Sequence, residues 1–308
     1  MNTIYASVDA ENPDASIMHQ AAEIIKNGGL VAFPTETVYG LGADAQNAEA
    51  VSKVYKAKGR PSDNPLIWHS NSVQELTNVA EFSETAYKLA DAFWPGALTM
   101  VLPSKTPIYP KTIAVRVSSH PVLQALISQS GCIIAAPSAN TSGRPSPTKA
   151  SHVSEDLDGV IDMIIDGGFS HKGLESTVVD LSTGTARLLR PGAVTLEMLQ
   201  NVIGKVEVVT SSSGAPLSPG MKYRHYAPRA PVILVEKGQA YTAAKAYEKA
   251  GILETSKYEN LDLAAKDLFD RLRQFDEQDV SVIVVEKVSE EGIGLAIMNR
   301  LNKAAARV

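Results

Sequence analysis

Cysteine is nearly absent from this sequence, because Cys132 is the only one among 308 residues. A single cysteine excludes an intrachain disulfide framework and a zinc site built from several thiolates. The histidines are scattered and form no HxxxH or HxxH pair, so we expect no metal site built by the protein itself. Cys132 lies among apolar residues in GCIIAAP, which is typical of a small buried strand residue rather than a reactive thiolate.

Long apolar runs are also missing. No stretch approaches the roughly 20 apolar residues that cross a bilayer, and the start, MNTIYASVDAENPD, lacks the basic and apolar regions of a signal peptide. We therefore expect a cytoplasmic protein without membrane contact. The net charge of -5 argues against a protein that coats nucleic acid, although a local basic patch is compatible with it.

The familiar nucleotide-binding loops are absent too. The chain has no GxGxxG sequence, no Walker A sequence and no paired-carboxylate signature. Aromatic residues make up only 6% of the chain, which argues against base-stacking platforms. A phosphate site in this protein must therefore be built from cations, hydroxyl groups and backbone.

Apolar patterns predict an α/β fold. Helical periodicity occurs at residues 14–29, 47–57, 84–93 and 121–129, and short apolar runs predict strands at 30–34, 113–119, 132–138, 159–166, 176–182 and 186–192. Several of these strands follow each other too closely for crossover helices. We therefore expect a mixed sheet rather than a purely parallel one.

The composition changes near residue 210. Residues 210–230 are rich in Ser, Pro and Gly, and they carry Lys222, Arg224 and Arg229 without any acid. We expect a larger domain at 1–209, a linker at 210–230 and a small α/β domain at 231–308 with helices at 239–250 and 261–275. The basic linker is expected to close over an anion as a flap hinged at Pro219–Gly220, and a passive tether is the alternative.

Four stretches place polar or cationic residues at the ends of probable strands. They are FPTETVYGLG (33–42), KAKGRPSDNPLIWHS (56–70), AAPSANTSGRPSP (135–147), and GLESTVVD (173–180) with LLRPG (188–192). Two prolines predict an irregular loop for the cations of the second stretch. Cations with neutral hydrogen-bonding groups suit anion binding and phosphoryl or nucleotidyl transfer. An ordinary loop remains the alternative for the first two stretches, each taken alone.

Arg116 lies inside the apolar strand IAVRVSS. A buried arginine must pair with an acid or point into a polar cavity, because an unpaired buried charge is costly. The residues leave open whether Arg116 forms a structural ion pair or binds a ligand.

At these motifs the chain resembles the YrdC-type threonylcarbamoyl-AMP synthases. The similar stretches are PTETVYGLG, KxR at 58–60, SxN at 138–140, GLESTVVD and RPG, while SPGMKYRHYAP and GIGLAIMNRLNKAA resemble the longer, two-domain form. The resemblance implies a YrdC-like domain with a twisted mixed sheet, a linker and a small Rossmann-like α/β domain. It also implies that L-threonine, bicarbonate and ATP become L-threonylcarbamoyladenylate and pyrophosphate, for N6-threonylcarbamoyladenosine formation at position 37 of tRNA.

The resemblance further implies the roles of individual residues. Lys58 and Arg60 are expected to be catalytic and to face the triphosphate, with Mg²⁺ bound through the ATP phosphates. The expected ATP-binding residues are Arg60, Asn64, Thr112, Ser138, Asn140, Ser146, Arg190, His225 and Tyr226. The expected L-threonine-binding residues are Thr35, His69, Arg116, Ala136 and Ser176, with Arg116 holding the carboxylate through two hydrogen bonds. No protein nucleophile is needed, because the carbamate of threonine attacks the α-phosphorus.

Two alternatives to this reaction make different predictions. A module that binds RNA without catalysis would show a steep salt dependence and no dependence on threonine. A relative of the YrdC-like segment of hydrogenase-maturation proteins would carry a zinc finger, which the single cysteine excludes. As partners we expect ATP, L-threonine, bicarbonate, the tRNA threonylcarbamoyl transferase machinery and, weakly, RNA.

Overall fold

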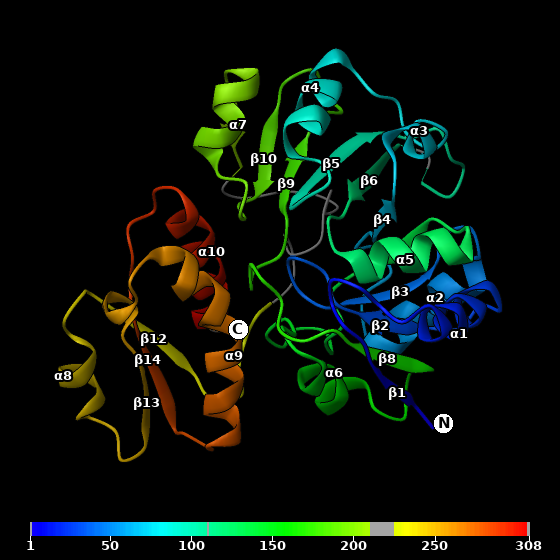
Figure 1. Ribbon diagram of the computed structural model, residues 1–308. Coiled ribbons are helices and arrows are strands. Elements are labelled where there is room, and N and C mark those ends of the chain that lie inside the picture. Colours follow the sequence, from blue (N-terminus) through cyan, green and yellow to red (C-terminus); the bar gives the residue numbers. More distant parts are fainter. Residues whose placement is uncertain (1, 110, 210–224, 307–308) are drawn as a thin grey trace.

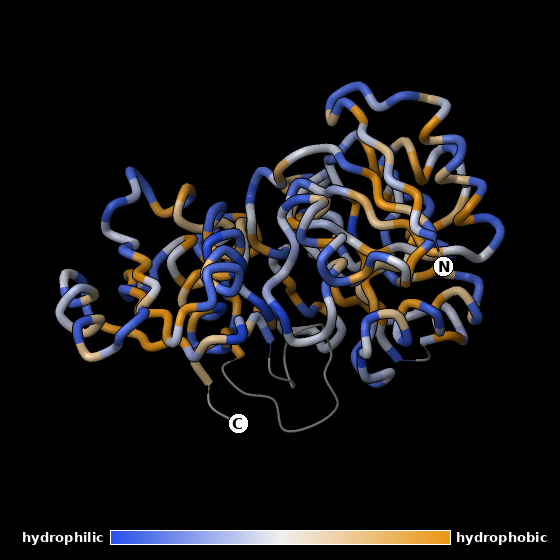
Figure 2. Tube along the Cα trace, turned by 90° about the horizontal axis from the view of Figure 1, so that it is seen from below, coloured by the Kyte–Doolittle hydropathy of each residue, from blue (hydrophilic) through white to orange (hydrophobic). Residues whose placement is uncertain are grey.

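The structure is a computed structural model that describes residues 2–109, 111–209 and 225–306. Two α/β units lie side by side in it, and each has hydrophobic segments in its interior (Figures 1 and 2). The larger unit contains β1 (Ile4–Ser7), α1 (Ala15–Lys26), β2 (Val31–Phe33), β3 (Gly40–Asp44), α2 (Ala48–Lys58), β4 (Ile67–Ser70), α3 (Val73–Leu76), α4 (Glu84–Phe93), β5 (Leu98–Pro103), β6 (Thr112–Val117), α5 (Pro121–Ser130), β7 (Ile134–Ala136), α6 (Ala150–Leu157), β8 (Met163–Asp166), β9 (Thr177–Asp180), β10 (Arg187–Arg190), α7 (Leu196–Ile203) and β11 (Glu207–Val208).

The larger unit is built on one mixed sheet of 11 strands in the order β1-β8-β2-β3-β7-β4-β6-β5-β9-β10-β11. The sheet contains both parallel pairs, such as β4 with β6, and antiparallel pairs, such as β5 with β6. The mixed sheet that the strand spacing predicts is therefore confirmed.

Period-two alternation in the central strands separates two layers of helices. Ala135 in β7 packs into the cluster that α2, α4, α6 and α7 cover, whereas Ile134 and Ala136 pack toward α1 and α5. The α1 and α5 layer covers only part of its face. Residues Ile67, Ala114 and Val178 of β4, β6 and β9 form a separate small cluster, and the candidate site opens beside it.

The smaller unit contains β12 (Val232–Val235), α8 (Ala240–Ala244), β13 (Ala250–Leu253), a 3₁₀ turn (Thr255–Lys257), α9 (Leu261–Glu277), β14 (Val282–Glu286) and α10 (Ile293–Ala305). Its three strands are parallel, in the order β12-β14-β13. Helices α9 and α10 cover one face and α8 the other. In Figure 1, α9 and α10 lie on the side that faces the larger unit.

Most predicted elements occur, with shifted ends. Helix α4 covers the predicted residues 84–93, whereas β8 begins at Met163 because a turn with Gly159 at φ 73 precedes it. The predicted helix at 239–250 is wrong beyond Ala244, because residues 245–249 are exposed and offer no apolar face, and residue 250 already starts β13.

The irregular loop predicted for the cations near residue 58 is wrong in part. Helix α2 runs to Lys58, and Gly59 ends it in the left-handed conformation, with φ 60. The prolines therefore do not end the helix, because Gly59 has already ended it, and Arg60 is the first of these cations outside the helix. Within the described residues, no helix is long and apolar enough to cross a membrane.

Candidate active site

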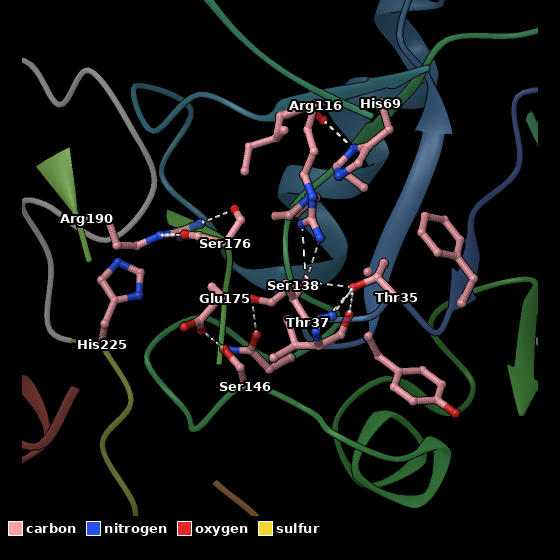
Figure 3. A pocket seen from close by; sticks show the side chains of 18 of the residues that line it. Thr35, Thr37, His69, Arg116, Ser138, Ser146, Glu175, Ser176, Arg190 and His225 are labelled. Carbon is pink, nitrogen blue, oxygen red and sulfur yellow. Dashed lines mark hydrogen bonds between the residues drawn. The ribbon is translucent and has the colours of Figure 1, made fainter. Parts of the chain in front are cut away.

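A pocket opens on the sheet face that α1 and α5 leave free (Figure 3). Side chains alternate between the two faces of a strand, so Ile67 and His69 lie on the same face of β4. Arg116 in β6 is the register partner of His69 and lies beside it. The residues that line the pocket are Phe33, Thr35, Thr37, Val38, Tyr39, Gly40, Arg60, Ile67, His69, Arg116, Ala136, Pro137, Ser138, Asn140, Ser146, Glu175, Ser176, Arg190, His225 and Tyr226.

The pocket brings together most of the residues expected from the sequence. Those that line it are Thr35, Arg60, His69, Arg116, Ala136, Ser138, Asn140, Ser146, Ser176, Arg190, His225 and Tyr226. Lys58, Asn64 and Thr112 are not among the lining residues. The predicted hinge at Pro219–Gly220, with Lys222, Tyr223 and Arg224, lies outside the described residues.

Arg116 forms a buried ion pair and lines the pocket as well, so the ion pair that the sequence left open is confirmed, and ligand binding by Arg116 stays a prediction. Its Nη2 lies 2.9 Å from Glu36 Oε1, and its Nε donates to the Gly96 carbonyl at 3.0 Å. Glu36 also accepts hydrogen bonds from the Ser118 hydroxyl at 2.5 Å and the Ser119 amide at 3.1 Å. Burial alone would raise the pKa of Glu36, but the charge of Arg116 and these hydrogen bonds lower it to about 2.

The fork of the Arg116 guanidinium is already in contact with a hydroxyl group. Both Nη1 and Nη2 donate to Thr37 Oγ1 at 3.2 Å. Thr37 Oγ1 lies 2.7 Å from Thr35 Oγ1, which donates to the Val38 carbonyl at 2.6 Å. A carboxylate that takes two hydrogen bonds from this fork must therefore displace the Thr37 hydroxyl.

His69 is buried beside Arg116 and is neutral at physiological pH. Burial and the charge of Arg116 lower its pKa to about 3. Its Nδ1 lies 3.1 Å from the Ile67 carbonyl oxygen. Because a carbonyl only accepts hydrogen bonds, this nitrogen carries the proton and the other ring nitrogen is an acceptor.

Lys58 is buried with its ammonium group turned to backbone rather than to the pocket. Its Nζ donates to the carbonyl oxygens of Ser138 and Asn140, and the Ser142 amide donates to the Lys58 carbonyl at 2.9 Å. Burial, followed by the charge of Arg60, lowers the pKa of Lys58 well below its usual value. In the described structure Lys58 therefore holds the loop that carries Ser138 and Asn140.

Arg60 lines the pocket and draws its support from the backbone. Its Nε donates to the Asn64 carbonyl at 3.1 Å and its Nη2 to the Pro65 carbonyl at 3.2 Å. Burial lowers the pKa of Arg60 to about 10, so it stays protonated at physiological pH. Asn64 thus reaches the pocket through Arg60, whereas Thr112 is half-buried at the start of β6.

Arg190, at the end of β10, is held by Ser176. Its Nε donates to the Ser176 carbonyl and its Nη2 to the Ser176 hydroxyl, both at 3.0 Å. That hydroxyl also lies 2.8 Å from Thr99 Oγ1. Figure 3 shows Arg190 and His225 together at one side of the pocket, away from Arg116 and His69.

His225 and Tyr226 close this side of the pocket from the stretch that leads into the smaller unit. Burial and the charge of Arg60 lower the pKa of His225 to about 3, so its ring is neutral. Tyr226 adopts φ 65 and stacks on Phe269 of α9, with ring centroids 5.4 Å apart. Arg229, one of the three cations of the predicted flap, binds Asp276 of α9 instead of facing the pocket.

Sequence reasoning missed two pocket carboxylates, Glu36 and Glu175. Both lie in motifs that were singled out, PTETVYGLG and GLESTVVD, but neither belongs to a paired-carboxylate pattern. The buried Arg116 was the available signal for Glu36, because such a cation requires an acid nearby. In the described ranges no three His, Cys, Asp or Glu side chains gather to hold a metal ion.

Comparisons with known proteins agree on one family. The family model described as "Telomere recombination" matches residues 23–192, and the model for the C-terminal domain of threonylcarbamoyl-AMP synthase matches residues 194–306. A threonylcarbamoyl-AMP synthase of Bacillus subtilis is 45% identical over 93% of this chain and 92% of its own length. One of Pyrococcus abyssi is 46% identical over 92% of this chain and 93% of its own. The crystal structure of P. abyssi Sua5 complexed with L-threonine superposes with a TM-score of 0.92 at 44% identity, covering 98% of each chain.

Proposed function

The chain belongs to the threonylcarbamoyl-AMP synthase family, and on that premise we propose that it makes L-threonylcarbamoyladenylate. L-Threonine, bicarbonate and ATP would give threonylcarbamoyl-AMP, pyrophosphate and water. The amine of threonine combines with carbon dioxide to form a carbamate, and a carbamate oxygen attacks the α-phosphorus as pyrophosphate leaves. The likeness to the family and to an L-threonine complex favours this reaction over an RNA-binding module without catalysis.

One observation carries the proposal: within the described residues, two buried arginines face the pocket without forming an ion pair. Arg60 is 8% exposed and Arg190 4% exposed, and neither forms an ion pair within the described residues. Arg116, by contrast, has Glu36. Because a buried charge without a counter-charge is costly, Arg60 and Arg190 are best explained by an anionic ligand, here the triphosphate of ATP.

The neutral groups around these arginines suit the rest of ATP. Ser138 Oγ donates to Asn140 Oδ1 at 2.5 Å, and Asn140 Nδ2 donates to the carbonyls of Thr141 and Arg144. This loop presents a hydroxyl group to the pocket and is held from behind by Lys58. We propose that Mg²⁺ arrives with ATP and is held by the phosphates, where it would offset their charge as pyrophosphate leaves.

The other side of the pocket suits threonine. Arg116 is the proposed partner of the carboxylate, which would displace the Thr37 hydroxyl from the guanidinium fork. Neutral His69 supplies one acceptor nitrogen, and the Thr35 and Ser176 hydroxyls and the wall at Ala136 complete the amino-acid site. The arrangement assigns charge stabilisation to arginines and requires no protein nucleophile.

The test is pyrophosphate release by the full chain, with L-threonine and bicarbonate omitted in turn. Release that depends on both supports the proposal, and release independent of threonine refutes it. Arg60→Met and Arg190→Met should each lower turnover by about 10²-fold, the typical effect of removing one preorganised charge-stabilising group. Arg271→Met is a matched control, because Arg271 binds Gln274 on α9 and does not line the pocket.

The product is a mixed anhydride that water hydrolyses, so we propose that it passes in the cytoplasm to the tRNA threonylcarbamoyl transferase machinery. Weak binding of RNA near the pocket is part of this proposal. Steady-state binding of tRNA at two salt concentrations tests it, because phosphate contacts weaken steeply as salt rises.

A further inference from the structure

Arg300 of α10 reaches from the smaller unit to the wall of the pocket. It is fully buried, its Nε donates to Glu175 Oε2 at 2.8 Å, and its Nη1 donates to the Pro191 carbonyl at 2.9 Å. Its Cζ lies 5.2 Å from the centre of the Tyr226 ring. Glu175 and Tyr226 line the pocket, and Pro191 directly follows Arg190, which lines it too. One side chain of the smaller unit thus contacts three parts of the pocket wall.

Glu175 connects Arg300 to a hydroxyl group of the pocket. Its Oε1 accepts a hydrogen bond from Ser146 Oγ, and its Oε2 accepts the one from Arg300. Burial alone would raise the pKa of Glu175, but the charges of Arg300 and Arg190 lower it, so the carboxylate is ionised. An ionised carboxylate only accepts hydrogen bonds, and the orientation of the Ser146 hydroxyl therefore depends on where Arg300 holds Glu175.

Helix α9 supports the same part of the wall. Arg273 is buried and donates to the Pro145 carbonyl through Nε at 3.2 Å and Nη2 at 2.7 Å, next to Ser146. The backbone of Lys266 packs on Gly173, where a Cβ atom would lie 2.2 Å from the Lys266 carbonyl oxygen. Helices α9 and α10 therefore both fix residues close to the pocket.

We propose that Arg300 is a positioning residue for the nucleotide side of the pocket, acting through Glu175 on Ser146. The inference rests on the proposed function, because it assigns Ser146, Arg190 and Tyr226 to ATP. All its contacts lie on this side, and none involves Arg116 or His69. The smaller unit is thus part of the nucleotide site, and it completes that site by docking.

A purely structural role for Arg300 makes a different prediction. If the ion pair only joined the two units, its loss would lower the melting temperature and affect both substrates alike. If it positions Ser146, its loss raises the KM for ATP and leaves the KM for threonine nearly unchanged. The split between the two KM values separates the roles.

The experiment uses the full chain and threonine-dependent pyrophosphate release, with ATP and threonine varied separately. Arg300→Met should raise the KM for ATP about tenfold or more, in line with loss of a buried charged hydrogen bond. The KM for threonine should change less than about threefold, and Arg300→Lys should restore only part of the ATP affinity. An unchanged KM for ATP, or an equal rise in both KM values, overturns the proposal.

The matched control is Lys149→Met. Lys149 Nζ lies 2.7 Å from Asp270 Oδ1 of α9, so this ion pair also joins the two units, but Lys149 does not line the pocket. Both KM values should stay at the wild-type level in this variant. A rise in the KM for ATP as large as that of Arg300→Met would mean that any loosening of the interface suffices, which also overturns the proposal.

A second pair of variants still tests the proposal if Arg300→Met does not fold. Ser146→Ala removes the other end of the chain of contacts without uncovering a charge, and Arg300→Lys keeps the charge. If Arg300 acts through Ser146, the two substitutions affect ATP affinity by the same route. The double variant should then lose less ATP affinity than the product of the two single fold-changes. Independent, multiplicative effects overturn the proposal.

Calorimetric titration with a non-hydrolysable ATP analogue separates this inference from the proposed function. A wild-type chain without threonine-dependent pyrophosphate release refutes the function. The same titration then still decides the inference, because it measures nucleotide affinity without turnover. Equal affinities of the wild-type and Arg300→Lys chains count against the inference whether or not the function holds.

Discussion

Replacement of Glu36 by Gln tests how the pocket keeps Arg116 buried. The substitution preserves the size of the side chain, but it removes the charge that faces Arg116 at 2.9 Å. It also keeps only one of the two oxygens that accept from the Ser118 hydroxyl (Oε2) and the Ser119 amide (Oε1). The guanidinium then remains buried without a counter-charge. Because desolvation of such a cation is not offset, the variant should be markedly less stable.

The pKa of Glu36 indicates how much stability the variant should lose. It falls from 4.5 to about 2 on folding, and at about 1.4 kcal/mol per unit this corresponds to roughly 3 kcal/mol of stability. Loss of one partner of a buried ion pair independently suggests about 3–5 kcal/mol. We therefore expect Glu36→Gln to lower the free energy of unfolding by about 3 kcal/mol at pH 7.

The pH dependence has a definite sign. Because the pKa of Glu36 is lower in the folded protein, its contribution is fully present above pH 4.5 and is lost as the pH falls toward 2. The difference in the free energy of unfolding between wild type and Glu36→Gln should therefore be nearly constant from pH 8 to pH 5 and should become smaller below pH 5. Urea unfolding at several pH values, followed by circular dichroism, measures this difference.

Glu84→Gln is the control, because Glu84 pairs with Lys88 at 2.7 Å on an exposed helix surface, where solvent screens the pair and its contribution to stability is small. Glu36→Gln should also raise the KM for threonine more than the KM for ATP, because Arg116 is the proposed partner of the threonine carboxylate. A loss of stability below about 1 kcal/mol, or a difference that does not become smaller in acid, would refute this account of the ion pair.

Three further substitutions test single contacts. Thr37→Val removes the hydroxyl from the Arg116 fork and should lower the KM for threonine severalfold, and a higher KM would mean that Thr37 binds the substrate itself. Lys58→Met should lower both the melting temperature and the turnover, because Lys58 holds two carbonyl groups, whereas loss of turnover alone would indicate direct phosphate contact. Gly173→Ala should weaken ATP binding by displacing α9 at Lys266, and unchanged calorimetric affinity would contradict this.

The sequence predicts the mixed sheet well because its signals are local. Strand alternation, the proline after a strand and the glycine after a helix each depend on a few neighbouring residues, as at Gly59 after α2. The same local signals fail where tertiary packing decides. Residues 245–249 contain no glycine or proline that would end a helix, yet they lie exposed without a core beside them, and the chain enters β13 at residue 250 instead.

The candidate site is predictable as a set of residues but not as a set of contacts. The motifs contain most of the residues that line the pocket, because these motifs lie at strand ends that the sheet brings together. They cannot show that Lys58 turns away to two carbonyl groups, or that Glu175 is held by Arg300 from 125 positions away in the chain. Such assignments depend on side-chain directions and on the docking of the two units.

Charge balance across the pocket follows a simple rule in the described residues. The two carboxylates among the lining residues, Glu36 and Glu175, are each held by one arginine, Arg116 and Arg300 respectively. Both carboxylates are therefore already neutralised and add little to the net charge that a ligand meets.

The remaining ionisable groups of the pocket divide into neutral and cationic ones. His69 and His225 are neutral, because burial lowers the pKa of each to about 3. Arg60 keeps its proton, with a pKa of about 10. Arg190 forms no ion pair within the described residues, because its acidic neighbour Glu175 is paired with Arg300. The pocket thus presents two unbalanced positive charges, Arg60 and Arg190, on the side proposed for the nucleotide, and a balanced ion pair on the side proposed for threonine. This asymmetry suits one polyanionic substrate and one zwitterionic substrate, and it orients them before any chemistry begins.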